Sequence, residues 1–157
     1  MAQRARRAGP CWVRVELVRE GGVAPYRARP VHDAEDAAGI LEPPLRREPT
    51  ETFLVALLDT RHGLVGLHRC ALGGIDSVRV EPRNVFTAAL LANAAAVIAA
   101  HNHPSGCATP SELDVLLTER LLRAGVILGV PLLDHLVVGH GCWTSIRTER
   151  PDLDWSY

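Results

Sequence analysis

The chain has 157 residues, of which 47% are hydrophobic and 22% are charged, and its formal net charge at pH 7 is −1. This length and composition fit one globular domain with a single hydrophobic core and exclude an intrinsically disordered chain. The small net charge gives no overall attraction for nucleic-acid phosphates or anionic membranes. All 17 basic residues are arginines, which excludes lysine as a Schiff-base nucleophile.

The cysteines predict reduced thiols rather than a disulfide framework. The four of them are far apart and form no C-x-x-C pair: Cys11, Cys70, Cys107 and Cys142. No apolar segment of signal-peptide length follows the basic N-terminus, and no window approaches about 18 uninterrupted apolar residues. We therefore expect a soluble, cytoplasmic protein without a membrane partner.

The first half of the chain shows strand and helix patterns separated by connectors. We expect a flexible tail at residues 1–10, one domain at 11–150 and a C-terminal tail at 151–157. Alternating apolar residues predict a strand at 11–19, and an acidic first turn predicts a helix at 33–41 before a proline-rich connector. Two apolar runs separated by a turn, 52–59 and 64–70, predict a β-hairpin.

The second half of the chain continues the mixed pattern. A helix is expected at 82–95, and the apolar run at 96–100 predicts a buried strand that ends directly before His101. A second helix at 111–125 should end at a C-cap glycine, Gly125. Its expected core-facing stripe is Leu113, Leu116, Leu117, Leu121 and Ala124. Two or three short strands follow, so the pattern favours an α/β (α+β) fold, a three-layer sandwich around a mixed β-sheet.

The stretch HNHPSGCATPSELD, residues 101–114, carries the strongest chemical signal. Residues two apart on a strand point to the same face, so His101 and His103 can converge on one point. The proline and glycine turn that follows reverses the chain, and the next helix can bring back a third ligand.

The start of that helix has two interpretations. Thr109 as N-cap and Glu112 at the third helical position would form a capping box, which would leave Ser111 and Asp114 free to serve a metal. Alternatively, Ser111 and Asp114 themselves spell the capping pattern S-x-x-D. Asp114 lies beside the expected apolar stripe, and a carboxylate that points inward there needs a partner such as a cation.

The donor types favour a catalytic metal site. Two histidines and one carboxylate with an open fourth position are typical of catalytic zinc, whereas a structural site has four protein ligands. Zinc deaminases need H-x-E with P-C-x-x-C, which this chain lacks. Amidohydrolases also carry H-x-H, but their barrel needs about 250 residues.

The pattern H-x-H-x7-S-x2-D, formed by His101, His103, Ser111 and Asp114, resembles the metal motif of the JAB/MPN (JAMM) metalloprotease family. More narrowly, ANAAAVIAAHNHPSG, PSELD and GVPLLDHLVVG are similar to the RadC-like branch of bacterial JAB-domain proteins. The similarity in pattern extends from about CWVRVELVRE to WTSIR, and it implies the JAB/MPN (cytidine deaminase-like) fold. No segment resembles the helix-hairpin-helix region that often precedes the domain in longer RadC proteins.

The resemblance also implies a reaction. It assigns zinc (Zn²⁺) to His101, His103 and Asp114, with water in the fourth position, and gives Ser111 a hydrogen bond to that water or to the oxyanion. Relatives use a glutamate near the start of an early core strand as general base, for which Glu51 is the best match and Glu48 the alternative. Hydrolysis of a peptide or isopeptide bond in a protein substrate is the activity that follows.

A second hypothesis belongs to another functional class. The RadC resemblance also suggests a non-catalytic accessory module of DNA repair or mobile-element biology. The intact ligand pattern favours the enzyme, and the near-neutral charge weighs against a nucleic-acid partner. The oligomeric state is left open.

Three further residues have open roles. Cys107 is expected to be a passive loop thiol, with inhibitory ligation of the metal as the alternative. Asp134 and His135 are expected to form buried hydrogen bonds at the start of a strand, with support of the metal site as the alternative.

Overall fold

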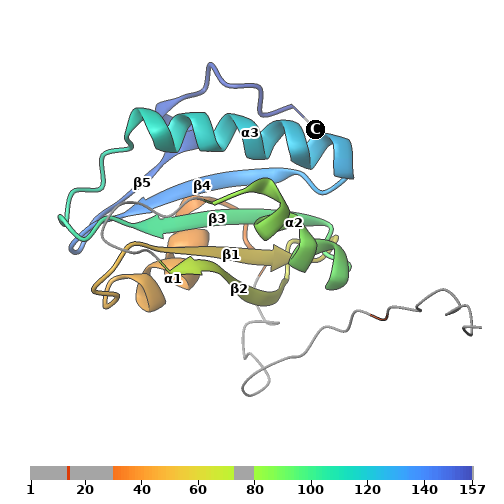
Figure 1. Ribbon diagram of the computed structural model, residues 1–157, viewed down its shortest axis with the longest axis horizontal. Helices are drawn as coiled ribbons and strands as arrows, with labels where there is room; N and C mark the ends of the chain where they lie inside the picture. The colour runs from red at the N-terminus through yellow and green to blue at the C-terminus, as the bar shows by residue number, and fades with distance from the viewer. Residues whose placement is uncertain (1–13, 15–29, 73–79, 157) are drawn as a thin grey trace, which may run out of the picture.

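The computed structural model describes residues 14, 30–72 and 80–156. The expected tail at 1–10 and, apart from residue 14, the expected strand at 11–19 lie outside the described residues. Figure 1 shows a sheet with helices on its two faces. The helices are α1 (Ala34–Leu45), α2 (Pro82–Leu91), α3 (Glu112–Leu128) and α4 (Ile146–Glu149). The strands are β1 (Thr52–Leu58), β2 (Leu64–Leu72), β3 (Ala96–Asn102), β4 (Leu132–Val138) and β5 (Trp143–Ser145).

The sheet is mixed and has the strand order β2-β1-β3-β4-β5. β3 and β4 pair in parallel, and the other three strand pairs are antiparallel. Parallel neighbours need a crossover connection, which α3 supplies between β3 and β4. β1 and β3 are buried along their whole length, as expected for strands covered on both faces.

Two apolar clusters lie on opposite faces of the sheet, because successive side chains of a strand point to opposite sides. Phe53 and Val55 of β1 pack with α2 and α3, whereas Leu54 and Ala56 pack with α1. Helices therefore cover both faces, and the predicted three-layer α/β sandwich with a mixed sheet is confirmed (Figure 1).

Some predicted boundaries were wrong. α1 continues through Pro43 and Pro44 into the expected connector and ends at Leu45. Neither proline has an N–H to donate to the helix, but Leu41 and Leu45 are fully buried, and this packing holds the last turn on the sheet. α2 ends at Leu91, earlier than expected.

The inward face of α3 also differs from the predicted stripe. Its buried residues are Asp114, Thr118, Leu121, Leu122 and Gly125. Leu113 and Leu116, expected in the core, have 72% and 54% of their surface exposed. Polar residues replace leucines on the inward face because they find hydrogen-bond partners there, as described below.

Gly125 is not the C-cap that the sequence predicted. The cap is Gly129, whose φ of 68° lies in the left-handed region that glycine adopts most easily. Gly125 lies inside the helix, where an added Cβ would lie 2.7 Å from the carbonyl oxygen of Val130. The glycine is needed for the close approach of α3 to the segment before β4.

Replacing Gly125 with alanine should therefore destabilise the fold, although alanine is the better helix former. We expect Gly125→Ala to lower the free energy of unfolding by about 1–3 kcal/mol, as overpacking does. Gly39→Ala is the matched control, because nothing lies within 4 Å of a Cβ there and the change should stabilise α1 by about 0.5–1 kcal/mol. Thermal denaturation followed by circular dichroism measures both, and equal effects would contradict the close-approach argument.

The buried Asp134 links β4 to β5 and α4 by hydrogen bonds. Its carboxylate accepts hydrogen bonds from the backbone N–H groups of His135 and Arg147 and from the Ser145 hydroxyl. Burial raises the pKa of this carboxyl, although these hydrogen bonds oppose the effect. The expectation of buried hydrogen bonding therefore holds for Asp134.

The segment after α4 packs against the domain. Leu153 belongs to the core cluster under α2 and α3, and the indole N–H of Trp155 donates to the Arg150 carbonyl. In the described part of the chain, no helix combines the length and hydropathy needed to cross a membrane.

Candidate metal centre

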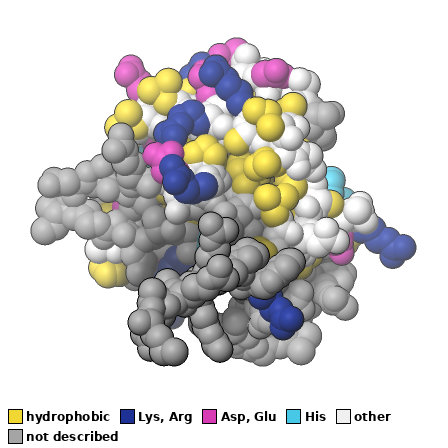
Figure 2. Space-filling model, turned by 45° about the vertical axis from the view of Figure 1, so that its right-hand side comes forward, with side chains coloured by type: hydrophobic (Ala, Val, Ile, Leu, Met, Phe, Trp, Pro, Cys, Tyr) yellow, Lys and Arg dark blue, Asp and Glu magenta, His cyan; other side chains and the backbone are white. Residues whose placement is uncertain are grey.

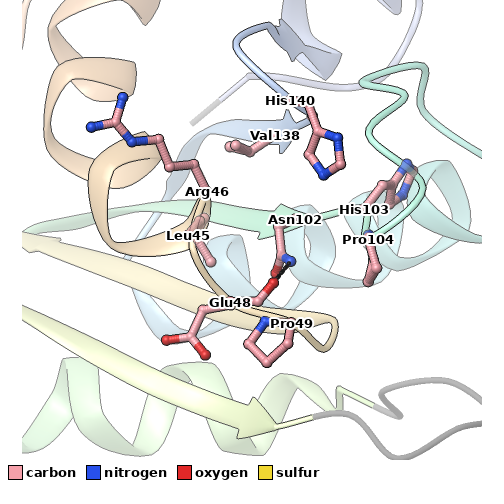
Figure 3. Close-up of a pocket in the computed structure, with 10 residues that line it drawn as sticks. Leu45, Arg46, Glu48, Pro49, Asn102, His103, Pro104, Val138 and His140 are labelled. Carbon is pink, nitrogen blue, oxygen red and sulfur yellow. Dashed lines mark hydrogen bonds between the residues drawn. The ribbon is translucent and has the colours of Figure 1, made fainter.

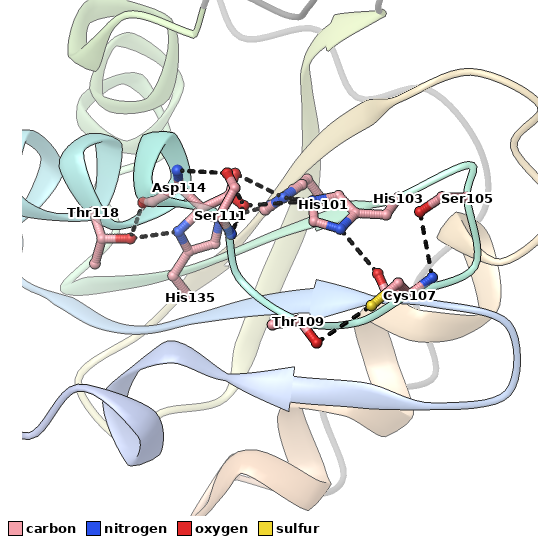
Figure 4. Close-up of polar contacts among 9 residues, drawn as sticks. All are labelled: His101, His103, Ser105, Cys107, Thr109, Ser111, Asp114, Thr118 and His135. Carbon is pink, nitrogen blue, oxygen red and sulfur yellow. Dashed lines mark hydrogen bonds and ion pairs between the residues drawn. The ribbon is translucent and has the colours of Figure 1, made fainter.

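His101 and His103 lie where β3 ends, and they point to the same side of the sheet as α3 (Figure 4). His101 is buried with 1% of its surface exposed, and its ring stacks on Phe53 of β1 with 6.0 Å between ring centroids. The Nε2 atoms of the two histidines are 3.0 Å apart. The strand geometry thus brings the two rings together as the spacing predicted.

Asp114 approaches the histidines from α3. Its Oδ1 is 3.1 Å from Nε2 of His101, and its Oδ2 is 3.4 Å from Nε2 of His103. These three residues form a group of donors that could hold a metal ion.

The prediction that Thr109 caps α3 was wrong. Ser111 is the N-cap, and Ser111 with Asp114 forms the capping box. The Asp114 N–H donates to the Ser111 hydroxyl oxygen, while the Ser111 N–H and O–H both donate to Oδ2 of Asp114 at 2.7 Å. The capping carboxylate is therefore also a member of the candidate metal group, because its two oxygens can accept from several donors at once.

The backbone decides which nitrogen of His103 carries its proton. Nδ1 lies 2.9 Å from the carbonyl oxygen of Cys107, which can only accept, so Nδ1 is the donor. A neutral imidazole then carries its lone pair on Nε2, the atom that faces His101 and Asp114. The loop after β3 thus presents His103 in the form that a metal requires.

The spacing of the donors fits a small tetrahedral ion. Zinc with ligand distances of about 2.0–2.1 Å holds neighbouring donor atoms roughly 3.3 Å apart. Here the two Nε2 atoms are 3.0 Å apart, and those of His101 and His103 lie 3.1 Å from Oδ1 and 3.4 Å from Oδ2 of Asp114, respectively. Two imidazole nitrogens and a carboxylate oxygen are also a donor set that zinc accepts.

Electrostatics favour an ionised carboxylate in this cluster. Burial raises the pKa of Asp114, but hydrogen bonds from His101, His103 and Ser111 outweigh it and hold the pKa well below its usual range. The hydrogen bond that a protonated His103 donates from Nε2 to Asp114 raises the pKa of His103, with burial opposing it and the charge of Glu51 adding to it. A bound metal would take the place of that Nε2 proton. An ionised Asp114 could serve as the anionic ligand of a cation.

Sequence comparison gives the family of this fold and site. The family model described as "RadC-like JAB domain" matches residues 31–151, more than half of the chain. The chain belongs to the RadC-like JAB domain family.

Similar proteins carry the name UPF0758. One from Marinomonas sp. (strain MWYL1) is 48% identical over 113 residues, which is 72% of this chain and 50% of that protein. Another from Thermosynechococcus vestitus is 43% identical over 115 residues, 73% of this chain and 46% of that protein. A third from Moorella thermoacetica is 40% identical over 117 residues, covering 74% of this chain and 51% of that protein. The chain thus spans about half the length of the curated relatives it matches.

In this RadC-like domain, the two glutamates considered as general base face different surroundings. Phe53 of β1 pairs with His101 in antiparallel register, so Glu51, two residues before Phe53, lies on the side of His103. Glu51 lines a cleft of about 600 Å³ together with His101, His103, Ser111 and Asp114. Glu48 instead forms an ion pair with Arg69 at 2.8 Å. Figure 3 shows its carboxylate directed away from His103.

Asn102, between the two histidines, points to the other side of β3 and holds the strand that follows Glu48. Its amide N–H₂ group donates to the carbonyls of Glu48 and Thr50, and its oxygen accepts from the Thr52 N–H. These bonds to residues on both sides of Glu51 hold the backbone directly before β1. No local pattern points to Asn102, because its partners lie about 50 residues earlier in the chain.

Cys107 is not one of the converging donors in the described residues. Its thiol hydrogen-bonds with the Thr109 hydroxyl at 3.3 Å, and only its backbone carbonyl contacts His103 (Figure 4). This arrangement is that of a loop thiol whose backbone, not its sulfur, serves the site.

The thiols should differ in reactivity. Burial raises the pKa of Cys70 to about 12, whereas the hydrogen bond with Thr109 lowers the pKa of the exposed Cys107. The thiolate is the nucleophile, so at about pH 8 Cys107 should be alkylated by iodoacetamide well before Cys70, and Cys70 should gain reactivity only at strongly alkaline pH. Peptide mapping by mass spectrometry during alkylation measures both, and faster labelling of Cys70 in folded protein would contradict this assignment.

Two further polar residues, His135 and Thr118, form buried hydrogen bonds next to His101. His135 of β4 and Thr118 of α3 are fully buried and hydrogen-bonded to each other at 2.7 Å. His135 also contacts His101, which matches the alternative of support for the metal site. Thr118 was missed, although its position four residues after Asp114 places it on the same helix face.

Proposed function

We propose that this RadC-like domain is a zinc-dependent peptidase or isopeptidase. The observation that carries the proposal is the cleft in which Glu51 lies with His101, His103 and Asp114. A group of converging metal donors with a carboxylate beside it is the minimum that metal-assisted hydrolysis requires.

The metal would be held by Nε2 of His101, Nε2 of His103 and the Asp114 carboxylate. When bound, zinc lowers the pKa of a water ligand to about 7 and polarises a carbonyl oxygen. Three protein ligands leave one position open, as in catalytic rather than structural zinc sites.

Glu51 would move the proton. Its carboxylate takes a proton from the attacking water and delivers it to the nitrogen of the leaving amine. Asn102 supports this role, because its hydrogen bonds fix the backbone on both sides of Glu51. Glu48 is a poorer candidate because its carboxylate is paired with Arg69.

Ser111 lines the same cleft. Its hydroxyl donates to Asp114 in the described structure and orients that carboxylate toward the histidines. We assign to the same hydroxyl the donation to the oxyanion of the substrate, which requires it to leave Asp114 during the reaction.

The cleft favours a peptide or protein as substrate. Leu113 and Leu116 are exposed and line the cleft beside the metal donors. Exposed leucines next to a polar site suit an extended chain that carries apolar side chains.

The pattern of separate, reduced thiols supports the cytoplasm as the place of action.

A non-catalytic module that binds nucleic acid is the second candidate. Phosphate contacts need a basic surface. On the face drawn in Figure 2, arginines lie among acidic and hydrophobic side chains rather than forming a basic patch. The net charge of −1 points the same way and supports the hydrolase.

The test combines metal analysis with a peptide-library cleavage screen on the full chain. Zinc-loaded protein should cleave a subset of peptides, and the same preparation treated with a chelator should not. Zinc binding without cleavage of any peptide or isopeptide-linked substrate would favour the binding module over the enzyme.

A further inference from the structure

A chain of three buried hydrogen bonds runs from the backbone of α3 to the candidate metal ligand His101. The Thr118 hydroxyl lies 2.7 Å from the carbonyl oxygen of Asp114 and 2.7 Å from Nδ1 of His135. Nε2 of His135 lies 3.0 Å from Nδ1 of His101. Figure 4 shows the rings and the hydroxyl in line behind the site.

The carbonyl at one end sets the direction of every proton in this chain. A threonine hydroxyl has one hydrogen, and a carbonyl oxygen can only accept, so the hydrogen of Thr118 points to Asp114. The hydroxyl oxygen must then accept from His135, which places a proton on Nδ1 of His135. Any other assignment would leave two oxygen lone pairs facing each other at 2.7 Å.

The hydrogen-bond direction fixed at Thr118 also determines the protons of His135 and His101. His135 is fully buried, where a charged ring would be costly, so its ring is neutral and carries one proton. With that proton on Nδ1, Nε2 of His135 can only accept, and Nδ1 of His101 must donate to it. The lone pair of neutral His101 is then on Nε2, the atom that faces His103 and Asp114.

We propose that Thr118 and His135 are positioning residues that hold His101 in the tautomer able to bind a metal through Nε2. His103 reaches the same state through the backbone carbonyl of Cys107. His101 lies inside a buried strand whose backbone pairs with β1 and β4, so the side chains of Thr118 and His135 fix its tautomer instead. The inference rests on the metal site of the proposed function, but not on its hydrolytic step.

The first test measures zinc affinity by competition with a chelating dye. In Thr118→Val, Nδ1 of His135 loses its hydrogen-bond acceptor, so the proton of His135 can move to Nε2. Nε2 of His135 then donates to Nδ1 of His101, and the proton of neutral His101 moves to Nε2, the atom needed for the metal. We expect the affinity to fall about 10–100-fold, the usual effect of losing such a partner. Thr118→Ser keeps the hydroxyl and should bind zinc within about threefold of the original protein.

Thr148→Val is the matched control for loss of a threonine hydroxyl. Thr148 lies in α4, and its hydroxyl donates to the hydroxyl of Ser145, the N-cap of that helix. Neither residue belongs to the candidate metal group, so zinc affinity should not change. Equal zinc affinity in folded Thr118→Val and in Thr148→Val would overturn the proposal.

The second test reads the tautomers in metal-free protein and works even if Thr118→Val fails to fold. Long-range ¹H–¹⁵N correlation spectra should show His135 protonated on Nδ1 and unprotonated on Nε2. A proton on Nε2 of His135 would overturn the proposal. If the original protein shows the expected tautomer but binds no zinc, the proposed function fails while the proton arrangement stands.

Discussion

The His103→Ala variant is expected to lose its metal. Protein purified without chelator should contain about one zinc per chain, and His103→Ala should contain little or none. The reason is that His103 supplies one of three converging donors, and its Nε2 lies 3.0 Å from that of His101. Removing it leaves two protein ligands, too few to compete with water for zinc.

Metal analysis by mass spectrometry measures this effect, and thermal unfolding gives a second readout. A ligand at 100 times its dissociation constant stabilises the folded state by about 2.7 kcal/mol. Zinc should therefore raise the melting temperature of the original protein and leave His103→Ala unchanged. His32→Ala, at an exposed histidine outside the donor group, is the control and should keep its zinc. Metal content unaffected by His103→Ala would remove the site assignment.

The second large effect is expected from Glu51→Gln. The amide cannot take a proton from water, so cleavage should fall by about 10²–10⁴-fold, the usual contribution of a general base. Zinc content should stay near that of the original protein, because Glu51 is outside the three-donor group. The experiment compares initial rates on a cleaved peptide at equal zinc occupancy.

Glu48→Gln is the matched control for Glu51→Gln. It makes the same chemical change on the same segment but touches only the exposed ion pair with Arg69, so the rate should change little. If Glu48→Gln abolished cleavage and Glu51→Gln did not, the two roles would have to be exchanged. Loss of zinc in Glu51→Gln would instead make Glu51 part of the metal site.

Local patterns were sufficient for much of the fold. The apolar runs that became β1 and β3 are long enough and uniform enough to predict strands buried on both faces. The position of His101 and His103 at a strand end also predicted their convergence, because alternation along a strand depends only on backbone geometry. The RadC resemblance was likewise present in the residues, and the family comparison confirmed it.

The orientation of α3 required the tertiary structure. Leucines at 113 and 116 predicted an apolar inward stripe, yet Asp114 and Thr118 take the inward positions. The periodicity of a helix shows which residues share a face. It cannot show that the Asp114 carboxylate will contact the imidazoles of His101 and His103, or that the Thr118 hydroxyl will contact the imidazole of His135. Burying polar groups is costly only when they lack partners, and those partners come from β3 and β4.

The sequence by itself determined the family, the sandwich and the residues that could hold a metal. Only the tertiary structure decided that Ser111 caps α3, that Glu48 pairs with Arg69, and that His135 stands behind His101. Each of these outcomes depends on contacts between segments far apart in the chain or on competition between neighbouring caps. The long-range contacts depend on how elements pack, which no local pattern encodes, whereas for the cap the local pattern offered two candidates and the tertiary structure chose between them.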